Sequence, residues 1–444
     1  MSKKSVLRTS FGVAALVLAG AAHGQASIKE AVEQAFKTNP DILIDSARRT
    51  SSEFALERAR AGYRPRIDAN LGLGYERTNN ATTRAAVGGS RSLTRQERGL
   101  TLSQMLYDNN ATASEVARTA ATVDSNAYKL AGTAEQLALK VAETYLEVLR
   151  MTELLVLTRE NLAAHEKTND QITLRANSGV GRRADQDQSE ARLALARANL
   201  LAPEAGQRDA EINFKRQVGS LPQNLGKPGE PPDAVLPTRL EDIIAAGIAN
   251  SPVRKQAKAD IDAAIAQNKA ARSQMGPSFS FEAGVSQNDN LSGTPGRNDT
   301  TYAMLRMRYN LFNGGGDQAR IDETAATVVM AEEIMRRTEV QIDQDSRQTW
   351  NAFRSATDRL PALKQHAESS FATRDAYSKQ FAIGQRTLLD LLDTENEYFT
   401  AQTDLVNGRY TALFARYRIL ADMSKLLEHL GVNLPKAATP LNPR

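Results

Sequence analysis

The chain has 444 residues, enough for two or three ordinary domains. Its 56 basic and 52 acidic residues give a formal net charge of +4, which argues against nucleic-acid binding, because that function requires a clustered basic face. The sequence contains no cysteine, which excludes disulfides and a lipid anchor on a cysteine thiol. Its four histidines are isolated, and the chain has no phosphate-binding glycine loop or triad-like motif. We therefore expect no enzyme, no metal and no cofactor.

The first 24 residues predict a secretory signal peptide. Lys3, Lys4 and Arg8 precede the apolar run 11–20, and small residues between Ala22 and Ala26 form a cleavage pattern. The apolar run is too short to span a bilayer as a helix. Without those three basic residues the chain has 53 basic and 52 acidic residues, so we expect an exported, nearly neutral mature protein.

The rest of the chain divides into two similar halves. Short motifs of the first half recur in the same order in the second: 38–40 as 250–252, 106–108 as 311–313, and Gly179, Asp185 and Glu190 as Gly384, Asp390 and Glu395. Proline and glycine mark a linker and a tail. We predict a first repeat over 25–217, a linker or equatorial insertion over 218–238, a second repeat over 239–430 and a C-terminal tail over 431–444.

The first repeat begins with a predicted helix over 27–61 that stops at Gly62 and Pro65. Apolar and polar residues then alternate from Ile67 to Glu76, which indicates a strand. A polar loop is predicted over 77–98, and Leu100, Leu102 and Leu106 mark a second strand. A helical pattern covers 109–217, with a break near 179–181.

The second repeat has the same plan. We predict a helix over 239–274, a strand over 278–285, a loop over 287–299 and a strand over 303–311. A long helical region follows the glycines 314–316 and is broken near Gly384. Each repeat thus contributes two strands and one long helical hairpin.

The strands alternate as the wall of a membrane barrel does, although a half-buried soluble sheet shows the same alternation. Four strands cannot close a barrel, whose smallest class has about eight, and open edges are not tolerated in lipid. Chains would therefore have to pool their strands. The segment 128–177 is long enough for a helix of about 75 Å, and its apolar residues follow a heptad seam that an intramolecular coiled coil would also show.

At this point the sequence resembles the TolC family of outer-membrane export ducts over about 27–431. The segment 384–393 (GQRTLLDLLD) matches the family pattern G-x-R-T-x-x-D-x-x-D, and 179–185 (GVGRRAD) is its counterpart in the first repeat. The resemblance implies an α+β membrane protein that forms a homotrimer. Four strands per chain would form a transmembrane β-barrel in outer-membrane lipid, continued into the periplasm by a long α-helical barrel of coiled-coil hairpins.

The resemblance also implies the functional residues. Asp390 and Asp393 would form acidic rings at a gate, and Arg386, Asp185 and Phe381 would belong to the links that close it. Phe381 stands where the family member compared has a tyrosine, so that hydroxyl link is missing. The hairpin tips would dock a periplasmic adaptor through Gly179, Val180, Gly181, Arg182, Arg183, Ile383, Gly384 and Gln385.

The implied function is the outer-membrane channel of a tripartite export system, working with a periplasmic adaptor and an inner-membrane transporter of the ABC ATPase class. The motif 182–185 (RRAD) and the missing anchor cysteine favour protein cargo, as in type I secretion. A multidrug or small-molecule efflux duct of the same fold is the alternative. A periplasmic adaptor is less favoured, because two similar halves with paired amphipathic strands do not fit that class.

Overall fold

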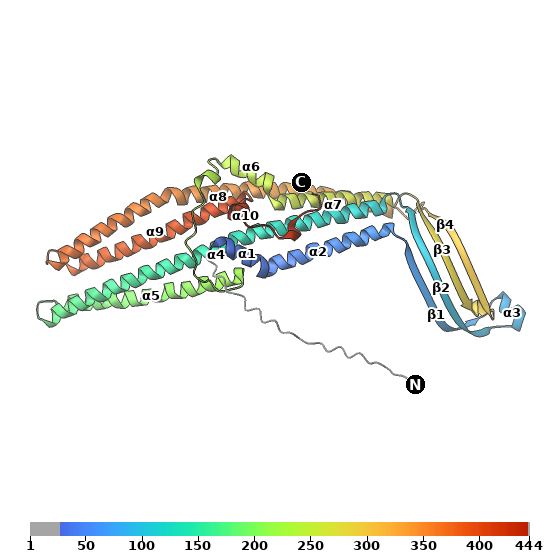
Figure 1. Ribbon diagram of the computed structural model, residues 1–444, viewed down its shortest axis with the longest axis horizontal. Helices are drawn as coiled ribbons and strands as arrows, with labels where there is room; N and C mark the ends of the chain where they lie inside the picture. Colours follow the sequence, from blue (N-terminus) through green and yellow to red (C-terminus); the bar gives the residue numbers. More distant parts are fainter. Residues whose placement is uncertain (1–26, 443–444) are drawn as a thin grey trace, which may run out of the picture.

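The computed structural model describes residues 27–442; the predicted signal peptide lies outside these residues. The described chain is elongated, with a four-stranded sheet at one end and two long helical hairpins reaching toward the other (Figure 1). Most of the shorter helices and the C-terminal segment lie along the long helices, whereas the short helix over 81–87 lies at the far end of the sheet (Figure 1).

The two halves present the same order of elements. The first contains α1 (Ile28–Thr38), α2 (Pro40–Arg60), β1 (Arg66–Thr78), α3 (Ala81–Val87), β2 (Arg91–Tyr107), α4 (Ala111–Asn177) and α5 (Arg183–Val218). The second contains α6 (Leu240–Asn250), α7 (Pro252–Ser273), β3 (Ser278–Asp289), β4 (Arg297–Arg308), α8 (Gly316–Ala382), α9 (Leu388–Asp422) and α10 (Leu426–Leu430). Between its two strands the first half carries an α-helix, α3, whereas the described second half has only the short 3-10 helix Leu291–Gly293 there.

The prediction of one continuous helix before each strand pair was wrong. The segments 27–61 and 239–274 each contain two helices, divided at Asn39-Pro40 and Ser251-Pro252. Each proline occupies the first position of a new helix, where a missing N–H is tolerated. The Asn39 side chain accepts the N–H of Asp41 at 2.9 Å, and Ser251 Oγ accepts the N–H of Arg254 at 3.3 Å. The two breaks are therefore capped helix starts.

The sheet has the order β1-β2-β3-β4 with all neighbours antiparallel. Opposed residues lie on the same face of a sheet, so the register Ile67–Leu102–Ala283–Ala303 defines one face. That face also carries the apolar residues Ala69, Leu71, Leu73, Tyr75, Leu100, Phe279, Phe281, Val285, Leu305 and Met307. The opposite face is mostly polar. In the described chain β1 and β4 each keep one unpaired edge.

The strands are longer at one end than the alternation predicts. The predicted loop 77–98 contains α3 and the start of β2 at Arg91, and the predicted loop 287–299 is shortened because β3 runs to Asp289 and β4 starts at Arg297. Apart from Leu93, the added part of β2 is polar on both faces. It nevertheless pairs with the apolar positions of β1: Thr94 lies opposite Tyr75, and Gln96 lies opposite Leu73. Backbone hydrogen bonding maintains the ladder without an apolar face. The last strand ends at Arg308, before the predicted residue 311.

The hairpins are built on two helices of 67 residues each, α4 and α8, which at 1.5 Å per residue are about 100 Å long. Their buried positions include many small side chains, which allows long helices to pack closely side by side. The largest fully buried side chains, Tyr145 and Phe214, join α4 to α5 with ring centroids 6.3 Å apart. No helix among the described residues is long and apolar enough to cross a bilayer.

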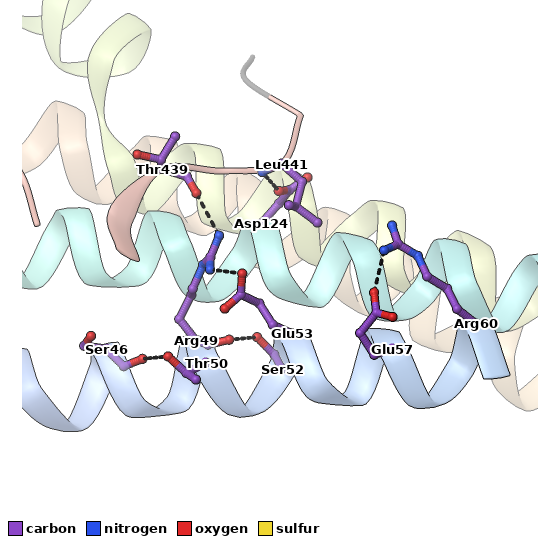
Figure 2. A network of polar contacts seen from close by, with 10 residues as sticks. All are labelled: Ser46, Arg49, Thr50, Ser52, Glu53, Glu57, Arg60, Asp124, Thr439 and Leu441. Carbon is purple, nitrogen blue, oxygen red and sulfur yellow. Dashed lines mark hydrogen bonds and ion pairs between the residues drawn. The ribbon is translucent and has the colours of Figure 1, made fainter. Parts of the chain in front are cut away.

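The C-terminal segment is predicted as a helix-breaking tail, and the structure shows that it is fastened to the first half (Figure 2). The buried carboxylate of Asp124 on α4 accepts the N–H of Leu441 at 2.5 Å and the N–H and side-chain amide of Asn442 at 3.3 and 3.2 Å. Arg49 on α2 donates to the carbonyl of Thr439 at 3.2 Å. The tail is thus anchored to both α2 and α4.

Candidate channel gate at the hairpin tips

Both hairpins reverse direction at the end of the molecule opposite the sheet (Figure 1). In the first, Gly179 has φ +76° between α4 and α5; in the second, Gly384 has φ +80° between α8 and α9. This left-handed conformation favours glycine. Val180 and Ile383 beside them are 83% and 70% exposed. Each turn therefore presents a large apolar side chain to its surroundings, next to the exposed Leu174 in the first hairpin and Leu389 in the second.

Asp390 takes part in the start of α9. Its Oδ2 accepts the N–H and the hydroxyl of Thr387 at 3.2 and 2.9 Å, while Thr387 Oγ1 accepts the N–H of Asp390. This reciprocal pair is a capping box. The hydroxyl bond from Thr387 is the main cause that lowers the pKa of Asp390 in the single chain. A ring of like charges would act in the opposite direction, and such a ring requires several chains.

Asp393 connects the two hairpins. Its Oδ1 lies 3.2 Å from Nη2 of Arg192, which is on α5. The Asp393 side chain is 60% exposed and that of Arg192 33% exposed. The sequence analysis did not single out Arg192, because the contact is made between helices about 200 residues apart and leaves no local pattern.

Phe381 forms a second contact between the hairpins. It is 7% exposed in an apolar cluster with Ile172, Leu388, Leu391 and Leu392. The guanidinium carbon of Arg175, on α4, lies 5.1 Å from the centre of the Phe381 ring, a cation–π distance. The Phe381 ring is therefore packed between the hairpins. Its neighbours Ile172 and Arg175, both on α4, were not predicted from the sequence.

Arg386 interacts with its own hairpin. Its guanidinium carbon lies 4.1 Å from the ring centre of Tyr377, and its Nε donates to Gln380 Oε1 at 3.0 Å. Asp185 lies in the first turn of α5, on the other hairpin. Within the described chain no hydrogen bond or ion pair joins Arg386 to Asp185.

The remaining tip residues shape the first turn. The N–H groups of Val180 and Gly181 both reach the carbonyl of Arg175, at 3.2 and 3.0 Å. A side chain at Gly181 would place its Cβ 2.7 Å from the backbone nitrogen of Ala176, so glycine is required there. Arg182 and Arg183 then begin α5. Over residues 27–442, no cluster of three or more His, Cys, Asp or Glu side chains could hold a metal ion.

Comparison with known proteins finds relatives along most of the chain. It is 26% identical over 437 residues to the outer membrane efflux protein BepC of Brucella suis, covering 95% of this chain and 91% of BepC. It is 24% identical to the outer membrane protein TolC of Escherichia coli, covering 90% and 83%. It is also 24% identical to the alkaline protease secretion protein AprF of Pseudomonas aeruginosa, covering 87% and 82%.

Solved structures share the fold. The Campylobacter jejuni CmeC outer membrane channel superposes with a TM-score of 0.78 at 13% identity, covering 90% of this chain and 86% of that one. The Vibrio cholerae outer membrane protein VceC gives 0.72 at 17% identity, covering 92% and 97%.

The family model described as "Outer membrane efflux protein" matches residues 31–220 and 244–421, which is most of both repeats. The predicted fold class is confirmed: an α+β membrane protein of the trimeric TolC type, located in the Gram-negative outer membrane with its helices in the periplasm. The family is one of channels rather than of enzymes. The chain belongs to the outer membrane efflux protein family.

Proposed function

We propose that this channel is the outer-membrane component of a tripartite export system that carries protein cargo. An inner-membrane transporter of the ABC ATPase class would deliver the cargo through a periplasmic adaptor, and the trimer would conduct it across the periplasm and outer membrane. The supporting observation is the extent of the match to AprF, whose name describes alkaline protease secretion and which aligns with 87% of this chain.

Small-molecule efflux by the same fold is the second candidate. A relative named for pyoverdine export, OpmQ of Pseudomonas aeruginosa, is also 24% identical, over 283 residues that cover 62% of this chain. AprF aligns with more of this chain than OpmQ does, whereas BepC, whose name describes efflux, aligns with 95% of it at 26% identity. The extent of alignment therefore does not separate the two kinds of cargo, and the proposal of protein cargo rests on the AprF match together with the motif 182–185 and the missing anchor cysteine.

Assembly follows from the sheet. The free edges of β1 and β4 would leave backbone N–H and C=O groups unpaired in lipid, where each costs several kcal/mol. Three chains supply twelve strands, above the roughly eight that a barrel requires. In such a trimer the apolar face of the sheet would meet lipid and the polar face would line the lumen.

The gate lies at the tips in this proposal. Asp390 and Asp393 would form acidic rings around the three-fold axis, and Arg386, Asp185 and Phe381 would belong to the closed arrangement. The exposed side chains of Val180 and Ile383, beside the turn glycines, are suited to contact an adaptor. The ion pair of Asp393 with Arg192 and the stacking of Arg175 on Phe381 would have to change when the hairpins separate.

The test is deletion of the gene in the source bacterium, with complementation by the intact gene. The secreted proteins in the medium and the accumulation of fluorescent small-molecule efflux substrates are measured in parallel. Loss of particular secreted proteins with unchanged dye accumulation supports protein export. Dye accumulation with a normal set of secreted proteins contradicts it and establishes the efflux alternative.

A further inference from the structure

A cavity of about 180 Å³ lies at the middle of the long helices, between the two halves of the chain. Glu135 and Leu139 of α4 line one side, and Asp345 and Ser346 of α8 with Asp422 at the end of α9 line the other. The junction of α6 and α7, at Ser251–Val253, completes the wall. The end of α9 and the short helix α10 that follows it lie far from the hairpin tips (Figure 1), and the cavity lining includes that end of α9.

The lining is acidic and lacks a basic partner. Glu135, Asp345 and Asp422 supply three carboxyl groups, and none of the residues that line the cavity is Lys, Arg or His. Glu135 is 8% exposed, and its Oε1 accepts the N–H of Leu426 at 2.8 Å. Of the three, only Glu135 is buried; Asp345 and Asp422 are half-buried, and Asp345 Oδ1 accepts the side-chain amide of Gln341 at 2.9 Å. Buried carboxylates are normally paired with a cation, and Glu135 has none within the described residues, so the cavity has the charge of a cation site.

An unsatisfied hydroxyl provides a second, independent observation. Ser346 is 1% exposed and lines the cavity, yet its Oγ has no hydrogen-bond partner among the described residues. Buried polar atoms are nearly always bonded, so such an atom at a cavity wall indicates that a bound species completes it.

The geometry selects the type of cation. The acidic groups do not form a cluster that could hold a metal ion within the described residues. An ammonium group has three donors and a guanidinium five, and each can reach acceptors that are spread around a cavity. Leu139, Val253 and Ile342 add an apolar surface suited to methylene groups.

We propose that this cavity binds a small organic cation that carries an ammonium or guanidinium group on a short alkyl chain. The site is independent of the gate and of the cargo, because it involves none of the tip residues.

Protonation supports the proposal and makes it measurable. Burial raises the pKa of Glu135 to about 7, partly opposed by the N–H groups of Leu426 and Leu427. Burial also raises the pKa of Asp422, while the hydrogen bond from Thr349 of α8 and the charge of Arg418, one turn earlier on α9, act in the opposite direction. Among the described residues that line the cavity, the titratable groups facing Glu135 are Asp345 of α8 and Asp422 of α9, and the α6–α7 junction supplies none.

A cation favours the ionised carboxylate, so affinity should fall as pH decreases through the pKa of Glu135. For one proton with a pKa near 7, the ionised fraction falls about tenfold between pH 8 and pH 6. We therefore expect about tenfold weaker binding at pH 6, with protons released upon binding at the lower pH.

The experiment is calorimetric titration of the purified oligomer in detergent with agmatine, 1,4-diaminobutane and the uncharged n-butylurea, at pH 8 and pH 6. We expect both cations to bind saturably and n-butylurea not to bind. The variant Glu135→Gln with Asp422→Asn, which keeps side-chain shape, should weaken binding at least tenfold. Ser346→Ala should weaken it several-fold while leaving the carboxyl groups in place. Glu160→Gln, an exposed position on the same helix α4, is the matched control and should bind as the wild type.

Two results would overturn the proposal. If the cations bind no better than n-butylurea, the cavity holds water only. If Ser346→Ala and the doubly neutralised variant both bind as tightly as the wild type, the cations bind elsewhere. Oligomer mass is measured for each variant, and Ser346→Ala alone decides the question if the double variant does not assemble.

Discussion

The replacement Arg192→Ala tests whether contacts between the two hairpins hold the proposed gate closed. The change removes the ion pair from α5 to Asp393 on α9, whose charged atoms lie 3.2 Å apart. It leaves the other contact between the hairpin tips, Arg175 stacked on Phe381, in place. We therefore expect a channel that assembles normally and opens more often.

The size of the effect follows from exposure. Arg192 and Asp393 are 33% and 60% exposed, and pairs this accessible to water contribute about 0.2 to 1 kcal/mol. If the three copies in a trimer break together, closure loses about 0.6 to 3 kcal/mol. The open-to-closed ratio should then rise about 3- to 150-fold.

The assay is single-channel recording in planar bilayers, which gives the open probability at rest. Arg197→Ala is the matched control: Arg197 lies on the same helix α5, but its partner Glu166, at 3.6 Å, is on α4 of the same hairpin. This control should leave the open probability unchanged. The charge exchange Arg192→Asp with Asp393→Arg should restore closure, because the pair is re-formed in reverse.

The reasoning is refuted if Arg192→Ala keeps the wild-type open probability. It is also refuted if Arg197→Ala opens the channel to the same extent, since the effect would then reflect general loosening of the helices.

Three further outcomes are expected. Asp390→Ala with Asp393→Ala should abolish cation selectivity and block by multivalent cations in the same recordings; unchanged selectivity would mean that these residues do not line the constriction. Gly384→Leu forces a side chain into φ +80°, a backbone conformation that costs about 1–2 kcal/mol. This variant should impair export while native mass measurement still shows trimers; normal export would show that the tip does not dock the adaptor. Asp124→Ala removes an acceptor of three N–H groups from the tail and should weaken its attachment by about 2–4 kcal/mol, seen as faster hydrogen exchange over 436–442; unchanged exchange would show that the carboxylate does not anchor the tail.

The sequence predicted the architecture because its local signals are periodic. Alternation from Ile67 to Glu76 identified a strand, and glycines at 179 and 384 identified the reversals of two long helices. It misplaced boundaries wherever the local signal was absent. The polar start of β2 at Arg91 has no apolar face, and it is a strand because β1 supplies a hydrogen-bonding partner. Asn39 and Ser251 each precede a proline, which is a signal for a helix boundary. The helix-favouring composition on both sides of each proline led to the prediction of one continuous helix.

The candidate site divides in the same way. The motif 384–393 predicted that Arg386, Asp390 and Asp393 lie at one hairpin tip, because all three follow the turn at Gly384 within ten residues of the same chain segment. The partners Arg192, Arg175 and Tyr377 could not be inferred, since each contact depends on how helices pack against one another. The acidic cavity is the extreme case: Glu135, Asp345 and Asp422 are about 80 to 290 residues apart in sequence. Periodicity and turn chemistry therefore determine which elements form, whereas packing alone decides which charges meet.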